Sequence, residues 1–307
     1  MVYHTIMAKS SMVEVANLRV DFGQTTVVKD LSFTVEKGQT LAFLGANGSG
    51  KTTTIRALLG IIEPVAGTLL IDGLPYRPDR NRLLGYLPEE RGLYKKEPVL
   101  ATMQYFGQLK GLSPQAARQW SKNYLEAVDL ADVGHRRLET LSGGQQQKIQ
   151  LGVTLMGDPE LLILDEPTKG FDPVNRRLLL DMVAERSKAG ATVILVTHQM
   201  EEVERLCDHV LLLKDGCNYV SGEIEAVRQQ YGMPLIDLEF QGRLAAKATS
   251  YTIKRQTGRQ AELEFTYGSR VADVWRELAS QPQLIVTRFE QRQSRIDDIF
   301  LEIYREA

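Results

Sequence analysis

One eight-residue stretch, residues 45–52, constrains the fold of this 307-residue chain more than any other. It fits the phosphate-binding loop pattern G-x-x-x-x-G-K-[ST] at every position. An apolar run at 39–44 precedes it and predicts a buried strand, and residues 53–59 predict a helix that ends at Gly60. The order strand, glycine-rich loop, helix predicts an α/β sheet. The eight residues are Gly45, Ala46, Asn47, Gly48, Ser49, Gly50, Lys51 and Thr52.

The residue types in this stretch suit nucleotide phosphates. Its glycines let the backbone curl so that successive N–H groups point at phosphate oxygens. The start of the following helix adds the positive end of its dipole. Lys51 can reach the β- and γ-phosphates, and the Thr52 hydroxyl can ligate Mg²⁺. The alternative, a glycine- and serine-rich turn with a chance lysine, does not account for the complete match or its flanks.

Composition bounds the class of protein. An apolar share of 43% and a charged share of 25% are those of a globular protein, long enough for one large domain or two ordinary ones. The formal net charge of −2 argues against nucleic acid as the main partner, although a local basic face stays possible. The two cysteines, Cys207 and Cys217, form no Cys-x-x-Cys pair, which favours a reducing compartment without structural zinc.

No apolar stretch approaches the roughly 18 residues that a membrane-spanning helix needs. Residues 1–12 lack the hydrophobic core of a signal peptide, and we expect them to form a flexible lead. We therefore expect a soluble chain, for which any role at a membrane requires a partner.

Two acids follow a second apolar run. Residues 161–164 are Leu-Leu-Ile-Leu, and Asp165 and Glu166 come next, as expected for a buried parallel strand that delivers carboxylates at its C-terminal end. The pair could be a solvated turn, but after a phosphate loop it better fits a magnesium ligand and a water activator. A further apolar run, 191–197, ends at His198. A lone histidine is more often structural, but this one tops a strand of the same predicted sheet.

Two weaker signals accompany these. Ser142 is a good helix cap, and Gly143 and Gly144 leave backbone N–H groups open to an anion, although such caps are common. Phe22 stands at a predicted strand end, where an aromatic ring could either stack on adenine or belong to the core.

The chain divides into regions of different pattern. Apolar residues recur at helical spacing between 98 and 138, where Ser113 and Pro114 predict a helix start, and a turn-rich break at 231–234 predicts a domain boundary. We predict a first domain over 13–231, with a helical part at about 95–157, and a small α+β domain over 235–307. The second region carries no chemical motif.

Taken together, these motifs resemble the ATP-binding cassette family over residues 13–231. The resemblance implies a P-loop NTPase cassette, with a mainly parallel core sheet, an antiparallel β subdomain and an inserted helical subdomain. The motifs are the Walker A loop at 45–52, the signature Leu-Ser-Gly-Gly-Gln at 141–145, Walker B with its glutamate at 161–166, the D-loop at 170–173 and the switch histidine His198.

The resemblance also implies a mechanism. Two cassettes would close head to tail around two ATP molecules, each bound between one loop 45–52 and the other subunit's signature. Thr52 and Asp165 would hold Mg²⁺, Glu166 would polarise the attacking water, and Lys51 and His198 would contact the γ-phosphate. Further nucleotide contacts are implied for Phe22 at adenine and for Thr53, Ser142, Gly143, Gly144 and Gln145.

One position departs from the family pattern. Members usually carry glutamine in the loop after the strand at 84–87, and this chain carries Glu89 with Glu90 beside it. A carboxylate can ligate Mg²⁺ or accept from water, so Glu89 stays a candidate for both metal binding and catalysis. Residues 85–94, together with the C-terminal stretch 297–301, resemble a subgroup of exporters that includes sodium-extrusion cassettes.

The resemblance implies the ATPase subunit of an exporter, a homodimer or heterodimer docked at the cytoplasmic face of the membrane on a separate multi-span permease. One alternative is a soluble cassette ATPase acting on ribosomes or DNA. The single Walker A motif, the lack of cysteine clusters and the slightly acidic charge disfavour it. Another is a regulatory or dimerisation module with a degenerate ATPase, which the intact Lys51, Asp165, Glu166 and His198 disfavour.

Overall fold

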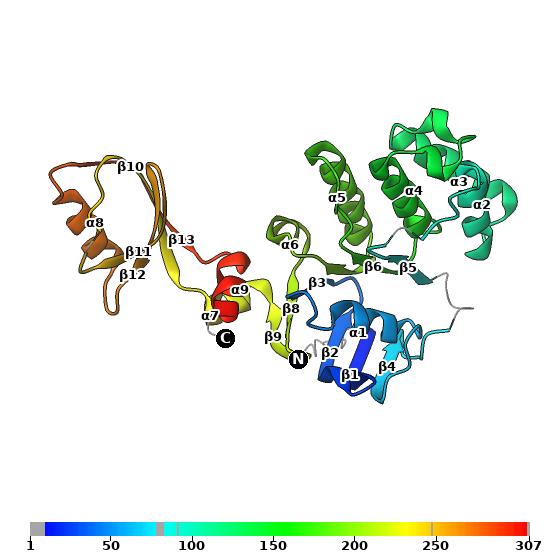
Figure 1. Ribbon diagram of the computed structural model, residues 1–307, viewed down its shortest axis with the longest axis horizontal. Helices are drawn as coiled ribbons and strands as arrows, with labels where there is room; N and C mark the ends of the chain where they lie inside the picture. The colour runs from blue at the N-terminus through cyan, green and yellow to red at the C-terminus, as the bar shows by residue number, and fades with distance from the viewer. Residues whose placement is uncertain (1–9, 78–82, 91, 247, 306–307) are drawn as a thin grey trace, which may run out of the picture. The chain divides into compact units, whose positions relative to one another are not determined.

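The computed structural model describes residues 10–77, 83–90, 92–246 and 248–305 (Figure 1). Contacts divide the chain into two compact units, Met1–Glu223 and Ile224–Ala307, which are taken separately below. Helix α7 (Ile224–Tyr231) groups with the second unit, so this division falls before the helix after which the sequence places a boundary. Of the expected N-terminal lead, residues 1–9 lie outside the described residues, and Ser11 already begins a strand.

The first unit is built on one sheet. Among the described residues, nine strands follow the order β4-β1-β2-β9-β8-β3-β7-β6-β5. The run β8-β3-β7-β6-β5 is parallel throughout, whereas β1 pairs antiparallel with both β2 and β4. This arrangement confirms the predicted parallel core and antiparallel part. The strands are β1 (Ser11–Phe22), β2 (Thr25–Glu36), β3 (Thr40–Gly45), β4 (Ala66–Ile71), β5 (Leu84–Leu87), β6 (Leu161–Asp165), β7 (Thr192–Val196), β8 (His209–Lys214) and β9 (Cys217–Glu223).

The central strands are continuous apolar runs because helices cover both of their faces. Along β6, Leu161 and Ile163 pack with Ile55 of α1 (Lys51–Leu58). The alternate residues, Leu162 and Leu164, pack instead with helices α4 (Gly143–Leu155) and α5 (Pro173–Lys188). Figure 1 shows α4 and α5 on one side of these strands. A parallel strand buried on both faces has no polar side to present.

The helical part is inserted between β5 and β6. Helices α2 (Val99–Leu109) and α3 (Pro114–Ala127) and the 3₁₀ turns η2 (Ala131–Val133) and η3 (Leu138–Thr140) lead into α4. Helix α3 begins as the sequence predicts: the Ser113 hydroxyl accepts the Ala116 N–H at 3.2 Å, and Pro114 occupies the first turn. The insertion has its own core around Met103, Tyr124 and Ile149.

The second unit is a small α+β fold, as predicted. Its strands pair antiparallel in the order β11-β12-β10-β13. Helix α8 packs Val274 and Leu278 on the apolar face of the sheet, which includes Ile236 and Phe240. The elements after α7 are β10 (Pro234–Gly242), β11 (Tyr251–Thr257), β12 (Gln260–Phe265), α8 (Val271–Ala279), β13 (Leu284–Gln293) and α9 (Ile296–Arg305).

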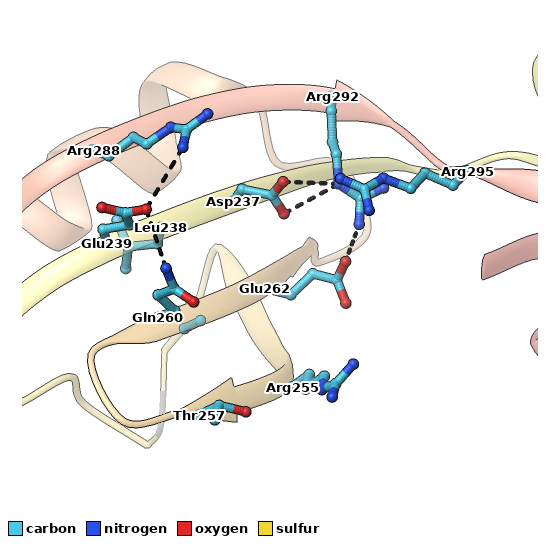
Figure 2. A pocket seen from close by; sticks show the side chains of 11 residues that line it. Asp237, Leu238, Glu239, Arg255, Thr257, Gln260, Glu262, Arg288, Arg292 and Arg295 are labelled. Carbon is cyan, nitrogen blue, oxygen red and sulfur yellow. Dashed lines mark hydrogen bonds and ion pairs between the residues drawn. The ribbon is translucent and has the colours of Figure 1, made fainter. Parts of the chain in front are cut away.

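Alternate residues of β10 carry charges into a groove of about 490 Å³ (Figure 2). At its centre, the Arg292 guanidinium donates to both carboxylate oxygens of Asp237, at 3.1 and 3.0 Å. The same guanidinium also pairs with Glu262 and with Asp298. One cation is therefore shared by carboxylates from two strands and from the helix that follows β13.

Candidate functional site

The predicted site residues gather where neighbouring parallel strands end. In the sheet, β7 lies between β3 and β6. The loop 45–52 follows β3, His198 comes just after β7, and Asp165 is the last residue of β6. Since the carboxyl ends of parallel strands open on one edge of a sheet, three distant stretches of sequence meet there.

The backbone of the loop 45–52 requires glycine at its start. A Cβ on Gly45 would lie 2.5 Å from Ser49 Oγ and 2.6 Å from the Leu213 carbonyl oxygen, which no side chain permits. Gly50 caps the following helix with a left-handed backbone, φ +106°. Helix α1 begins at Lys51, so the prediction that it starts at residue 53 was wrong by two residues. The helix N-terminus therefore reaches into the phosphate-binding motif itself.

Two side chains of this loop have the donors that a phosphate chain needs. Ser49 is only 6% exposed, and its hydroxyl has no hydrogen-bond partner among the described residues. A buried hydroxyl left unpaired costs about 1–3 kcal/mol, so the site favours a ligand with acceptor oxygens. Lys51 Nζ donates to the carbonyl oxygens of Gly45 and Ala46, at 2.8 and 3.0 Å. The ammonium group of Lys51 is thus held by the first residues of the same loop that would bind a phosphate.

The two predicted magnesium ligands lie together. Thr52 Oγ1 donates to Asp165 Oδ2 at 3.1 Å. The pKa of Asp165 is raised to about 6, chiefly by burial and also by the nearby carboxylates of Glu89 and Glu166, while the Thr52 hydrogen bond opposes the rise. Burial also lowers the pKa of Lys51, which these carboxylates counter. The site concentrates negative charge around hard oxygen ligands, which suits a divalent cation.

The predicted catalytic pair is also brought together. His198 Nδ1 lies 2.9 Å from Glu166 Oε1. Glu166 has a left-handed backbone, φ +50°, which is uncommon outside glycine. Its N–H donates to the Val196 carbonyl at 2.8 Å, which ties the turn after β6 to the end of β7. Backbone strain of this kind persists only where the surroundings hold it, and it concentrates at active sites.

Glu89 has a partner that sequence reasoning missed. Its Oε1 lies 2.6 Å from Lys169 Nζ, in the loop that follows Glu166. The hydrogen bond to Glu89 raises the pKa of Lys169. The sequence signal that could have indicated this pair is the position of Lys169, a cation between the acids Glu166 and Asp172. The structure pairs Glu89 with a lysine at the edge of the site.

The signature residues form a helix start, as predicted. Ser142 Oγ accepts the Gln145 N–H at 3.3 Å, and Gln145 Oε1 accepts the Ser142 N–H at 3.0 Å, a complete capping box. Helix α4 also packs on the loop after β6, where Gln147 Nε2 donates to the Pro167 carbonyl at 3.2 Å. These contacts leave the first N–H groups of α4, at Gly143 and Gly144, without a role in the capping box.

Phe22 lies at the end of β1 and is 50% exposed. This exposure answers the question that the sequence left open, because Phe22 is not a core aromatic. Its ring is accessible to a planar ligand.

A second set of residues behind the site was not foreseen. Glu202, on helix α6 (Met200–Leu206), is fully buried and accepts hydrogen bonds from Thr168, Arg176 and Thr197. Two of these donors belong to the loops that carry Glu166 and His198. Glu202 is one of two adjacent acids in the first turn of a short helix, and nothing in the sequence indicates which of them is buried.

Comparison with known proteins agrees with this geometry. The sequence model of a family described as "ABC transporter" matches residues 28–169. An uncharacterized ABC transporter ATP-binding protein of Methanocaldococcus jannaschii is 39% identical, over 78% of this chain and 87% of its own length. Nod factor export ATP-binding protein I of Cupriavidus pinatubonensis is 30% identical, over 97% of this chain and 92% of its own. A solved ATP-binding subunit of an ABC transporter superposes with a TM-score of 0.67 at 29% identity, covering 72% of this chain and 93% of that one.

Proposed function

Since this chain belongs to the ABC transporter family, as one of its ATP-binding subunits, we propose that it hydrolyses ATP to drive export through a separate membrane permease. The observation that carries the proposal is the meeting of loop 45–52, Asp165 and the Glu166–His198 pair at adjacent strand ends. Each of the three serves a different part of phosphoryl transfer to water.

The loop 45–52 binds the phosphates, with Lys51 and the unpaired Ser49 hydroxyl as side-chain donors. Thr52 and Asp165 are the residues that hold Mg²⁺, and Glu89 is a further candidate. When bound, the ion offsets charge on the phosphate oxygens. The unpaired Ser49 hydroxyl fits the phosphate oxygens of ATP, and the acidic side chains fit Mg²⁺.

Glu166 accepts a hydrogen bond from the attacking water. The water oxygen bonds to the γ-phosphorus as the bridging P–O bond breaks, which releases ADP and phosphate. His198 Nδ1 holds the Glu166 carboxylate, and its other ring nitrogen is left for a γ-phosphate oxygen. Holding both groups in place before ATP arrives lowers the cost of reorganisation in the transition state.

A second cassette subunit completes the site in this proposal. The helix start at Ser142 offers an anion N–H groups and the positive end of a helix dipole. The Ser142 Oγ accepts from Gln145, so its own proton stays available to a partner's ATP. Phe22 stacks on adenine in the same scheme, and its exposure supports this role.

The membrane partner is a permease on a separate chain, which holds this subunit at the cytoplasmic face. No described helix has the length and apolar character needed to cross a bilayer. The inserted helical part exposes an aromatic cluster: Tyr94, Tyr105 and Phe106, with ring centroids 5.6 to 6.0 Å apart. Both tyrosines are about half exposed. Exposed aromatic surface of this kind suits docking of a partner's helix.

The export direction draws support from relatives whose names state it, the Nod factor export proteins, with which this chain aligns through its second unit as well. These relatives also favour a transporter over an ATPase that acts on ribosomes or DNA.

A trapping experiment tests the proposal. Tagged Glu166→Gln is incubated with Mg-ATP, extracted from membranes in mild detergent, and its co-purifying proteins are identified by mass spectrometry. A stoichiometric multi-span membrane protein is the expected result. Lys51→Ala, which lacks the ammonium group that binds the phosphates, serves as the matched control. Recovery of ribosomal or DNA-bound proteins without a membrane protein would overturn the transporter assignment.

A further inference from the structure

The carboxylate of Glu202 lies in the interior of the first unit, 0% exposed, behind the strand ends that carry the site. Its Oε1 accepts from Thr168 Oγ1 and, at 3.1 Å, from Arg176 Nε. Its Oε2 accepts from Thr197 Oγ1 at 3.0 Å. A buried carboxylate is tolerated only when it is paired and hydrogen-bonded, and here both oxygens are engaged.

The donors around Glu202 come from the two loops that carry the catalytic pair. Thr168 follows Glu166 by two positions, and Thr197 directly precedes His198. Gln199 closes the network, since its N–H donates to Thr197 Oγ1 at 3.1 Å and its Nε2 to Thr168 Oγ1 at 3.4 Å. The two loops are thus joined by a second set of hydrogen bonds, in addition to the Glu166–His198 contact.

This bridge explains how a strained residue is held. Glu166 has φ +50°, its N–H donates to the Val196 carbonyl at the end of β7, and its own carbonyl accepts the Lys169 N–H at 3.2 Å within the same loop. The Glu202 bridge fixes Thr168 on its C-terminal side. With both sides tied to the end of β7, the Glu166 carboxylate stays 2.9 Å from His198 Nδ1.

We propose that Glu202 is a positioning residue for ATP hydrolysis, which sets the Glu166 carboxylate against His198 through the hydroxyls of Thr168 and Thr197. This inference rests on the proposed function, in which Glu166 activates the water. Only a carboxylate meets three donors at once without presenting a donor of its own. Arg176 supplies the compensating charge, on a side chain that is mostly buried.

The test compares Glu202→Gln with Glu201→Gln, a neighbouring change on the same helix at an exposed position, where the carboxylate pairs with Arg176 at 3.5 Å. Glu202→Gln keeps the size of the side chain but turns an amide toward a hydroxyl. Because a displacement of about 1 Å at a catalytic group can cost about 100-fold, we expect kcat to fall by about 10- to 100-fold. The Kd for Mg-ATP should stay within about twofold, because the loop 45–52 is untouched, and Glu201→Gln should leave both values unchanged.

A double variant shows whether Glu202 acts through Glu166. Glu166→Gln/Glu202→Gln should hydrolyse ATP no more slowly than Glu166→Gln alone, since the group being positioned is already gone. If Glu202→Gln does not fold, Thr197→Val removes one bond and should lower kcat with the same unchanged Kd. A wild-type kcat for a folded Glu202→Gln would overturn the inference, as would equal losses in kcat and ATP affinity. If Glu166→Gln itself hydrolysed ATP at the wild-type rate, the proposed function would fail instead.

Discussion

Lys169 Nζ lies 2.6 Å from Oε1 of Glu89, so a cation from the loop after β6 pairs with the carboxylate of the loop after β5. Both side chains are open to solvent, 60% and 41% exposed, and a pair of this kind contributes little to folding stability. The pair matters instead for the charge around Asp165. Glu89 adds to the negative charge that raises the pKa of Asp165, and Lys169 offsets part of that charge.

Glu89→Gln tests the role of this acid. We expect Mg-ATP to bind about as well as in the wild type, within about threefold, and the hydrolysis rate to change, because an amide can donate to a phosphate where a carboxylate cannot. Calorimetric binding and steady-state hydrolysis measure the two effects. Glu90→Gln is the control at the next position. Unchanged hydrolysis in Glu89→Gln would remove Glu89 from the catalytic residues.

Lys169→Glu reverses the charge of the partner. The site would then hold Glu89, Asp165, Glu166 and a further carboxylate around Lys51. We expect the Kd for Mg-ATP to rise by about fivefold to tenfold, and this loss to shrink at high salt, because the charges are exposed. Adding Glu89→Gln to the same chain should recover part of the affinity. An affinity equal to wild type at low salt would show that Lys169 does not influence the site.

Asp165→Asn should stabilise the nucleotide-free protein at neutral pH while abolishing hydrolysis. Burial raises the folded-state pKa of Asp165 to about 6, above its unfolded value of about 3.9. The folded state therefore binds the proton more tightly, and wild-type stability falls as pH rises from about 4 to about 6. The variant avoids this loss, which is at most about 3 kcal/mol above pH 6.

Urea unfolding at pH 4 and pH 7.5 measures this difference between variant and wild type. It should be small at the lower pH and favour the variant at the higher. Asp172→Asn gives the opposite sign, because hydrogen bonds from Asn175 hold the pKa of Asp172 below its usual value. A variant that is less stable than wild type at pH 7.5 would contradict the assignment of buried charge to Asp165.

Arg292→Met should destabilise the second unit. Its guanidinium is only 15% exposed and pairs with Asp237, Glu262 and Asp298, which would be left without a cation (Figure 2). We expect a loss of about 2–4 kcal/mol, below the value for a fully buried pair because the carboxylates are partly solvated.

Trp275, which packs on Phe289, reports unfolding of this unit by fluorescence once Trp120 has been changed to phenylalanine. The matched control is Arg288→Met on the same strand, whose side chain is 58% exposed and which should lose less than about 1 kcal/mol. Equal losses in the free energy of unfolding for the two variants would show that the three ion pairs of Arg292 do not make it more important for stability than Arg288.

Local motifs were sufficient to predict the centre of the site. Each of Lys51, Asp165 and His198 follows an apolar run that can only be a strand buried on both faces, and parallel strands bring their ends together. The same logic predicted the parallel core, and the pair Ser113-Pro114 predicted the start of α3. The roles assigned to these residues remain predictions, as do the domain bounds.

The rest depended on contacts that no local pattern encodes. Strand β11 has no clear signal in the sequence, because its residues, Tyr-Thr-Ile-Lys-Arg-Gln-Thr, are polar at most positions, and it lies at the edge of its sheet. Glu202 was missed because an acid in the first turn of a helix is usually solvated, and only the fold brings Thr168 and Thr197 onto it. Lys169 reached Glu89 across 80 positions of sequence.

The helical insertion leaves the sheet after β5 and returns in β6, and these two strands are hydrogen-bonded neighbours, with Leu84 opposite Leu161 and Leu87 opposite Leu164. Because the two strands are parallel, the insertion leaves at the carboxyl end of β5 and returns at the amino end of β6, so it crosses from one edge of the sheet to the other. A chimera that carries a relative's insertion on this sheet should keep Thr52, Asp165 and His198 in place, whereas the helix start at Ser142 would be exchanged together with the docking surface, because both belong to the insertion.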